Sequence, residues 1–285
     1  MLKIQNVGAF PGGDAFLLDD GSGACLLDTG FGFCGEALAV HVRRALAERP
    51  LDAILLTHSH YDHACGAPHV QALYPDAPVL AHEYAAQVFQ KPGAKRVMRE
   101  MDQSAAALFG VTAYTDRIDA LHADRILRDG DTVTVGAHAF TVLHQPGHTR
   151  CSIAFWCESE RLLIASETLG VPAGGDLVAP AYLIGYGCTL DAIDRALALP
   201  VERMLLPHNG VLEGAARCRR FLENARFWAV EAHERVHAAH RAGADEAACI
   251  ELLYKLFYTP ETAHGQPEKA FRLNASYMVP MLLRE

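Results

Sequence analysis

The sequence lacks long apolar runs and carries little positive charge. No stretch reaches the ~18 apolar residues that a membrane-spanning helix needs, and no basic segment followed by an apolar one opens the chain. We therefore expect a soluble, cytoplasmic protein without a membrane partner. The 25 Lys and Arg stand against 34 Asp and Glu, a formal net charge of -9. This balance disfavours a nucleic-acid partner, because phosphate binding uses clustered Lys and Arg, but it permits a small-molecule substrate, even an anionic one.

Two common catalytic or structural signals are also missing. The 8 cysteines are scattered along 285 residues without a CxxC pair, a pattern far from that of a small disulfide scaffold. We interpret them as mostly buried thiols. No G-x-S-x-G segment is present to supply a serine nucleophile.

The first two thirds of the chain alternates short apolar runs with turn residues. This pattern is typical of helices packed on β-sheets, so the expected fold class is α/β. Helical patterns dominate two other regions, an insertion or lid over residues 83–125 and a tail after residue 214. We predict one domain over residues 1–214 and a helical cap over 215–285 that packs on it. The cap helices are also the expected contact of a homodimer.

One short segment concentrates the chemistry. His58, His60, Asp62 and His63 lie within six residues, directly after an apolar strand at 53–56. A strand would alternate their side chains between two faces, whereas a loop that turns into a helix can direct them to one point. Imidazole and carboxylate groups suit Zn, Fe, Mn, Co or Ni. The spacing therefore predicts a metal site rather than an exposed polar loop.

The HxHxDH pattern after a strand resembles the metallo-β-lactamase superfamily. Further matching segments follow in order at strand ends: Leu26 to Gly30 around Asp28, Pro146 to Thr149 around His148, and Leu206 to Gly210 around His208. The resemblance covers residues 4–214 and implies an αβ/βα sandwich of two mixed β-sheets flanked by helices. It implies that His58, His60 and His148 hold one metal ion, and that Asp62, His63 and His208 hold a second. Asp28 would brace the histidine loop by hydrogen bonds.

One position departs from this family pattern. The family places a bridging Asp where this sequence has Glu167, in Ala165-Ser166-Glu167-Thr168. Glutamate adds a methylene group, which moves the carboxylate by up to ~1.5 Å. Glu167 is expected as a metal ligand, with the alternatives that it binds only one ion or points elsewhere. The substitution leaves open whether one or two ions bind.

The resemblance implies a hydrolase. Two divalent ions, with Zn²⁺ expected first and Fe or Mn as alternatives, lower the pKa of a bound water to about 7, and the resulting hydroxide attacks the substrate. Asp62 would orient that hydroxide. The helical insertion and tail resemble, more loosely, the quinolone-signal-response thioesterases and glyoxalase II, which favours an ester, thioester or lactone substrate. An iron-dependent oxidoreductase of the persulfide-dioxygenase type and a regulatory protein with little hydrolysis remain as alternatives.

The segment from 171 to 187 is expected to form a loop over the metals. Tyr182 and Tyr186 in this loop are candidates for the substrate pocket, where a hydroxyl would donate to a substrate oxygen, or they are packing aromatics. His82 and His144 are more readily explained as core or surface residues than as ligands. His233, His237 and His240 share a helix face, which is more often solvated than metal-binding.

Overall fold

The computed structural model describes residues 2–285, apart from the side chains of 264 and 265. The chain forms two compact units. The first comprises the residues up to 144 together with 157–160, and the second comprises 145–156 and 161–285. The predicted boundary at residue 214 stays a prediction.

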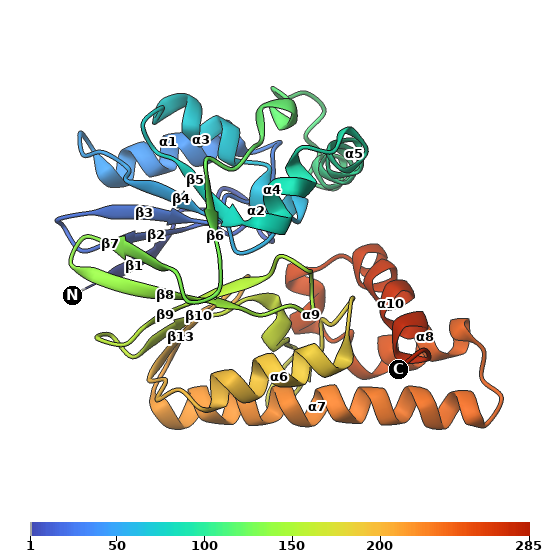
Figure 1. The fold of residues 1–285 in the computed structure, drawn as a ribbon. Helices are drawn as coiled ribbons and strands as arrows, with labels where there is room; N and C mark the ends of the chain where they lie inside the picture. The colour runs from blue at the N-terminus through green and yellow to red at the C-terminus, as the bar shows by residue number, and fades with distance from the viewer. Residues whose placement is uncertain (1) are drawn as a thin grey trace. The chain divides into compact units, whose positions relative to one another are not determined.

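The first unit contains a six-stranded mixed sheet in the order β1-β2-β3-β4-β5-β6 (Figure 1). Its strands are β1 Lys3–Asn6, β2 Phe16–Asp19, β3 Ala24–Leu27, β4 Ala53–Leu55, β5 Val79–His82 and β6 Arg125–Leu127. The first three pair antiparallel, and β3 to β6 pair parallel. Strands β3, β4 and β5 are buried along their whole length, as expected of parallel strands covered on both faces.

Helices flank this sheet. They are α1 Gly35–Leu46, α2 Tyr61–Ala64, α3 Ala67–Leu73, α4 Glu83–Phe89, α5 Pro92–Leu108 and the short 3₁₀ helix η1 Ile118–Ala120. Helices α1 and α3 contact each other on one face of the sheet (Figure 1). Helices α4 and α5 lie in the stretch for which a helical insertion is expected. The strands β7 Thr132–Val135 and β8 His138–His144 form an antiparallel hairpin.

The second unit has its own mixed sheet, in which the strands follow the order β14-β13-β10-β9. They are β9 Ile153–Cys157, β10 Leu162–Ile164, β13 Arg203–Leu206 and β14 Gly210–Glu213. Strands β10 and β13 are parallel, and β13 and β14 are antiparallel. The 3₁₀ helix η2 Glu167–Leu169 follows β10. It leads into a hairpin of two short antiparallel strands, β11 Val171–Pro172 and β12 Val178–Ala179.

The remaining helices belong to the second unit. They are α6 Tyr186–Leu197, α7 Ala215–Arg241, α8 Glu246–Phe257, α9 Pro260–Gly265 and α10 Glu268–Leu282. Helix α7 packs beside α6 and also contacts β12, β13 and β14 (Figure 1). Asp245 caps α8 by accepting from the amide of Ala248 at 2.8 Å, which ends the α7 to α8 turn sharply.

Two mixed sheets flanked by helices confirm the predicted α/β fold class. All eight cysteines are free and seven are buried, which confirms their interpretation as packing thiols. Among the residues that the structure describes, no helix combines the length and hydropathy that a membrane span requires.

Candidate functional site

The histidine motif begins where strand β4 ends. The chain leaves this buried strand, passes through His58 and His60 and enters the short helix α2 at Tyr61. The His58 ring centroid lies 4.6 Å from that of His60 and 4.1 Å from that of His63. The loop-to-helix turn therefore gathers the three imidazoles, as the side-chain geometry requires.

Asp28 braces this motif from the end of strand β3. The residue is buried, and its backbone takes a left-handed conformation with φ 52°, which is uncommon for a residue other than glycine. Its Oδ1 accepts from the Thr57 amide at 2.8 Å. Its Oδ2 accepts from the Thr57 hydroxyl at 2.8 Å and lies 2.9 Å from His63 Nδ1. One carboxylate thus fixes both the end of the strand and a ring of the motif.

These contacts decide which ring nitrogen carries the hydrogen. An ionised carboxylate only accepts hydrogen bonds, so His63 donates from Nδ1 to Asp28. The Thr57 hydroxyl gives its single hydrogen to Asp28, so His58 donates from Nδ1 to that hydroxyl over 3.1 Å. A neutral ring held in this way keeps its lone pair on Nε2, which is the arrangement of a histidine prepared to bind a metal ion.

Thr29 and Gly66 also hold the motif, although the sequence did not mark them as site residues. The amide and the hydroxyl of Thr29 both donate to the carbonyl of His63, at 2.7 and 2.9 Å. Gly66 passes so close to Thr29 that a Cβ atom at position 66 would lie 2.0 Å from the Thr29 carbonyl oxygen. In the sequence, the only feature that pointed to these residues was the Thr29-Gly30 turn next to Asp28.

The second unit carries its own set of candidate ligands. The His148 amide donates to the Thr168 hydroxyl at 3.1 Å, and His148 Nδ1 lies 2.8 Å from the carbonyl of Ala181. His148 Nε2 lies 2.9 Å from Oε2 of Glu167. The other carboxylate oxygen, Oε1, lies 3.6 Å from Nε2 of His208, whose backbone is left-handed with φ 62°. Glu167 therefore points toward both histidines rather than away.

The donor set fits a divalent metal ion. Nδ1 of His148 already donates to a carbonyl, so a neutral ring would direct the lone pair of Nε2 at the carboxylate of Glu167. Two acceptors at 2.9 Å are stable only with a cation between them, either a proton or a metal ion. Imidazole nitrogen with carboxylate oxygen is the ligand mixture of Zn²⁺ and its transition-metal neighbours.

The two tyrosines proposed for the substrate pocket differ in their surroundings. Tyr182 is fully buried, and its hydroxyl donates to the carbonyl of Ala229 in α7 at 3.0 Å. Burial raises the pKa of this hydroxyl. The one hydrogen of this hydroxyl is therefore donated inside the unit, and a role of Tyr182 in a substrate pocket stays a prediction. Tyr186 is partly exposed, and its ring stacks on His233 at 4.2 Å between centroids.

Two further histidines, His82 and His144, and the cysteine beside the motif lie outside these sets. His82 and His144 stack on each other at 4.3 Å in the first unit, and His82 Nδ1 accepts from the Tyr84 amide as a cap of α4. Burial raises the pKa of the Cys65 thiol, which favours a packing role over a redox role.

Residues 9–208 match the sequence model of the metallo-beta-lactamase superfamily, which is more than half of the chain. This chain belongs to the metallo-β-lactamase superfamily. The membership agrees with the observed sheets and helices and confirms the family that the histidine motif indicates. Among solved superfamily structures, a metallo-beta-lactamase family protein from Thermus thermophilus superposes with a TM-score of 0.67 at 21% identity, covering 99% of this chain and 93% of that one.

Curated relatives of this chain include a thioesterase and a hydroxyacylglutathione hydrolase. The acyl-coenzyme A thioesterase MBLAC2 of Homo sapiens is 28% identical over 185 residues, 62% of this chain and 62% of that protein. A hydroxyacylglutathione hydrolase of Methylobacterium nodulans is 31% identical over 179 residues, 61% of this chain and 55% of that protein. The matched region thus spans less than two thirds of each relative.

Proposed function

We propose that this superfamily member is a metal-dependent hydrolase of small thioesters, with esters and lactones as related substrate classes. The observation that carries the proposal is the hydrogen bonding of His58, His63 and His148, each of which is held through Nδ1. Rings oriented in this way present Nε2 as a ligand and lose little freedom when a metal ion binds.

We propose that residues of the two ligand sets together hold two divalent ions, with zinc as the first candidate and iron or manganese as alternatives. His58, His60 and His148 would hold one ion, and Asp62, His63 and His208 would hold the other. Glu167 would contact one ion or both. Ions of this kind, when bound, lower the pKa of a coordinated water and polarise a carbonyl group.

The protein side chains have separate tasks in this proposal. The Asp62 side chain is partly exposed, and its Oδ2 lies 4.0 Å from His63 Nε2, so this proposed ligand is also open to water. It would accept a hydrogen from the attacking water and orient it toward the substrate carbonyl. Asp28, buried behind the motif, would hold the His63 ring in place during turnover.

The choice of a thioester rests on the relatives and on chemistry. The two relatives named above are a thioesterase and a hydroxyacylglutathione hydrolase, and both names describe thioester cleavage. A thiolate is a good leaving group and needs little help from a protein acid, which agrees with a site built from imidazole and carboxylate side chains. The net charge of -9 makes a nucleic-acid substrate unfavourable.

A substrate panel tests this function. Protein purified without added metal is first analysed for metal content, then assayed on acyl thioesters, aryl esters, lactones and phosphodiesters. We expect turnover of thioesters, and a loss of about 100-fold or more in kcat/KM for His58→Ala and Asp62→Asn. His122→Ala is the control, because His122 pairs with Asp124 at the surface.

Two results would contradict the proposal. One is full activity in both site variants. The other is a fully metal-loaded protein that turns over no member of the panel, which would favour a regulatory protein. A single bound iron together with oxygen consumption on a persulfide would instead identify the oxidoreductase alternative.

A further inference from the structure

Helix α5 carries a buried carboxylate outside the ligand sets. Asp102 is 0% exposed, and burial raises the pKa of its carboxyl group. Its Oδ1 accepts from the amides of Gly32 and Phe33, at 2.7 and 3.3 Å. Buried carboxylates are rare because desolvation costs free energy, so one that accepts from two backbone amides has a defined structural task.

The loop that Asp102 holds is the loop that braces the histidine motif. Gly32 and Phe33 follow Asp28 and Thr29 after two intervening residues, Gly30 and Phe31. Thr29 donates twice to the carbonyl of His63, and the carbonyl of Gly30 accepts from the Gly66 amide at 3.2 Å. Hydrogen bonds, together with the backbone of residues 28–33, therefore connect Asp102 in α5 to His63 and Gly66 at the C-terminal end of helix α2.

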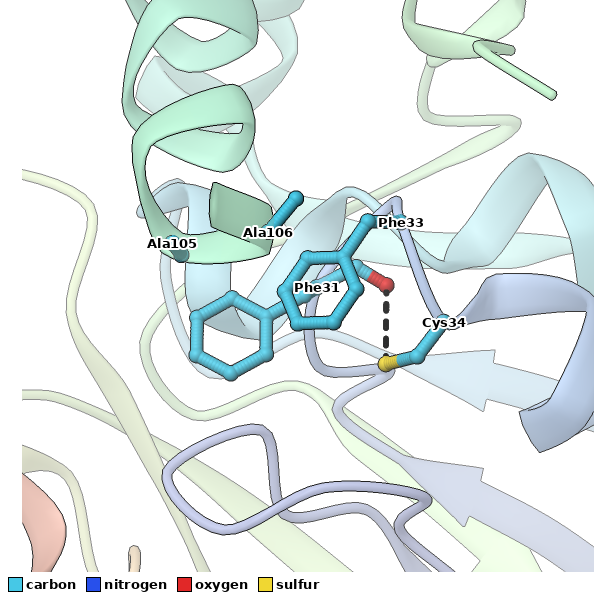
Figure 2. Close-up of a cluster of buried hydrophobic side chains, with 5 residues drawn as sticks. All are labelled: Phe31, Phe33, Cys34, Ala105 and Ala106. Atoms are coloured by element: carbon cyan, nitrogen blue, oxygen red, sulfur yellow. Dashed lines mark hydrogen bonds between the residues drawn. The ribbon is translucent and has the colours of Figure 1, made fainter. Parts of the chain in front are cut away.

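Apolar packing follows the same route. Phe31 and Phe33 stack at 5.0 Å and form a buried cluster with Cys34, Ala105 and Ala106 (Figure 2). The two alanines lie one turn beyond Asp102 on α5, so the helix contacts the loop through both its carboxylate and its apolar face. Phe31 also contacts the ring of Tyr61, 5.7 Å away, between His60 and Asp62 in the motif.

We infer that Asp102 is a positioning residue that couples the helical insertion to the histidine motif. It holds the loop of residues 28–33 in place, and Asp28 and Thr29 of this loop hold His63 by hydrogen bonds. As far as it concerns metal binding, the inference rests on the proposed function; as far as it concerns the order of the motif, it stands by itself. Packing alone does not replace the carboxylate, because the Gly32 and Phe33 amides need an acceptor inside the unit.

Two substitutions at this position and one control separate positioning from simple stability. Asp102→Ala removes the acceptor. Asp102→Asn keeps the volume and one acceptor oxygen but loses the charge, which roughly halves the strength of each hydrogen bond. Met98→Ala is the control, because Met98 is buried on the same helix and makes no hydrogen bond to the loop.

The first readout is hydrogen exchange of the backbone amides without metal. In Asp102→Ala we expect faster exchange at Gly32 and Phe33 and also at Thr29, Thr57 and Gly66, whose amides donate within the motif. Asp102→Asn should show the same pattern with a smaller increase. Met98→Ala should destabilise the unit without a selective increase in the exchange rates of these amides. The inference is overturned if the acceleration stops at Gly32 and Phe33, or if the control reproduces the whole pattern.

The second readout is the affinity for Zn²⁺ and the visible absorption spectrum of the Co²⁺-loaded protein. We expect Asp102→Ala to weaken Zn²⁺ binding by about tenfold, the lower end of the range for residues behind metal ligands, and to change the Co²⁺ spectrum. Met98→Ala should leave both unchanged. A wild-type protein that binds neither ion would refute the proposed function, and the exchange experiment would then decide the inference alone.

Discussion

At the scale of single residues, two candidate site residues have a left-handed backbone conformation, which is uncommon for residues other than glycine. Asp28 and His208 have φ of 52° and 62°, and neither is a glycine. Left-handed residues of this kind cost of order 1–3 kcal/mol and persist where the surroundings hold them. At Asp28 the three hydrogen bonds to Thr57 and His63 supply that restraint.

Another residue-scale consequence concerns His69, a buried histidine on α3. It is 4% exposed, its ring lies against Gly35, and burial lowers its pKa. The unfolded chain therefore binds a proton more readily than the folded protein, so stability falls as the pH drops below about 6.5. We expect His69→Leu to lack this contribution. The free energy of unfolding of the variant, measured relative to that of the wild type, should therefore rise as the pH is lowered from 7.5 to 5.

Urea unfolding at several pH values measures this effect. A difference between variant and wild type that does not depend on pH would contradict it. His122→Ala provides a comparison of opposite sign, because a hydrogen bond to the carbonyl of Ala120 raises the pKa of His122.

At the scale of elements, the sequence predicts what depends on local pattern. The apolar strand expected at 53–56 agrees with β4, and the helical pattern expected after residue 214 agrees with α7 to α10. The segment from 171 to 187 is different. Its hairpin β11–β12 has two-residue strands that exist only through their mutual pairing, and α6 begins at Tyr186 with glycines on both sides. Such elements are defined by tertiary contacts that no local pattern records.

Tyr182 gives a prediction at this scale, because it ties the segment before α6 to helix α7. Tyr182→Phe removes the hydroxyl that donates to Ala229. We expect a loss of about 1 kcal/mol in the free energy of unfolding and no change in KM for a hydrolysed thioester. Denaturant titration and steady-state kinetics check both parts. A raised KM with unchanged stability would instead assign Tyr182 to substrate binding.

At the scale of the whole molecule, each compact unit carries one ligand set, and the two sets differ in how visible they are in the sequence. The first lies between His58 and His63, so its spacing alone predicts it. The second collects His148, Glu167 and His208 from three segments that follow β8, β10 and β13. Only the family resemblance connected them, and the direction of the Glu167 carboxylate, toward both histidines, is seen only in the structure.

The central claim is that the two sets bind metal ions together. Crystals grown with Zn²⁺ and measured across the zinc absorption edge test it directly through anomalous scattering. We predict peaks whose ligands include His58 or His63 from the first set and His148 or His208 from the second, with Glu167 in contact with at least one ion. The absence of a peak at these residues, or a peak bound by only one set, would contradict the claim.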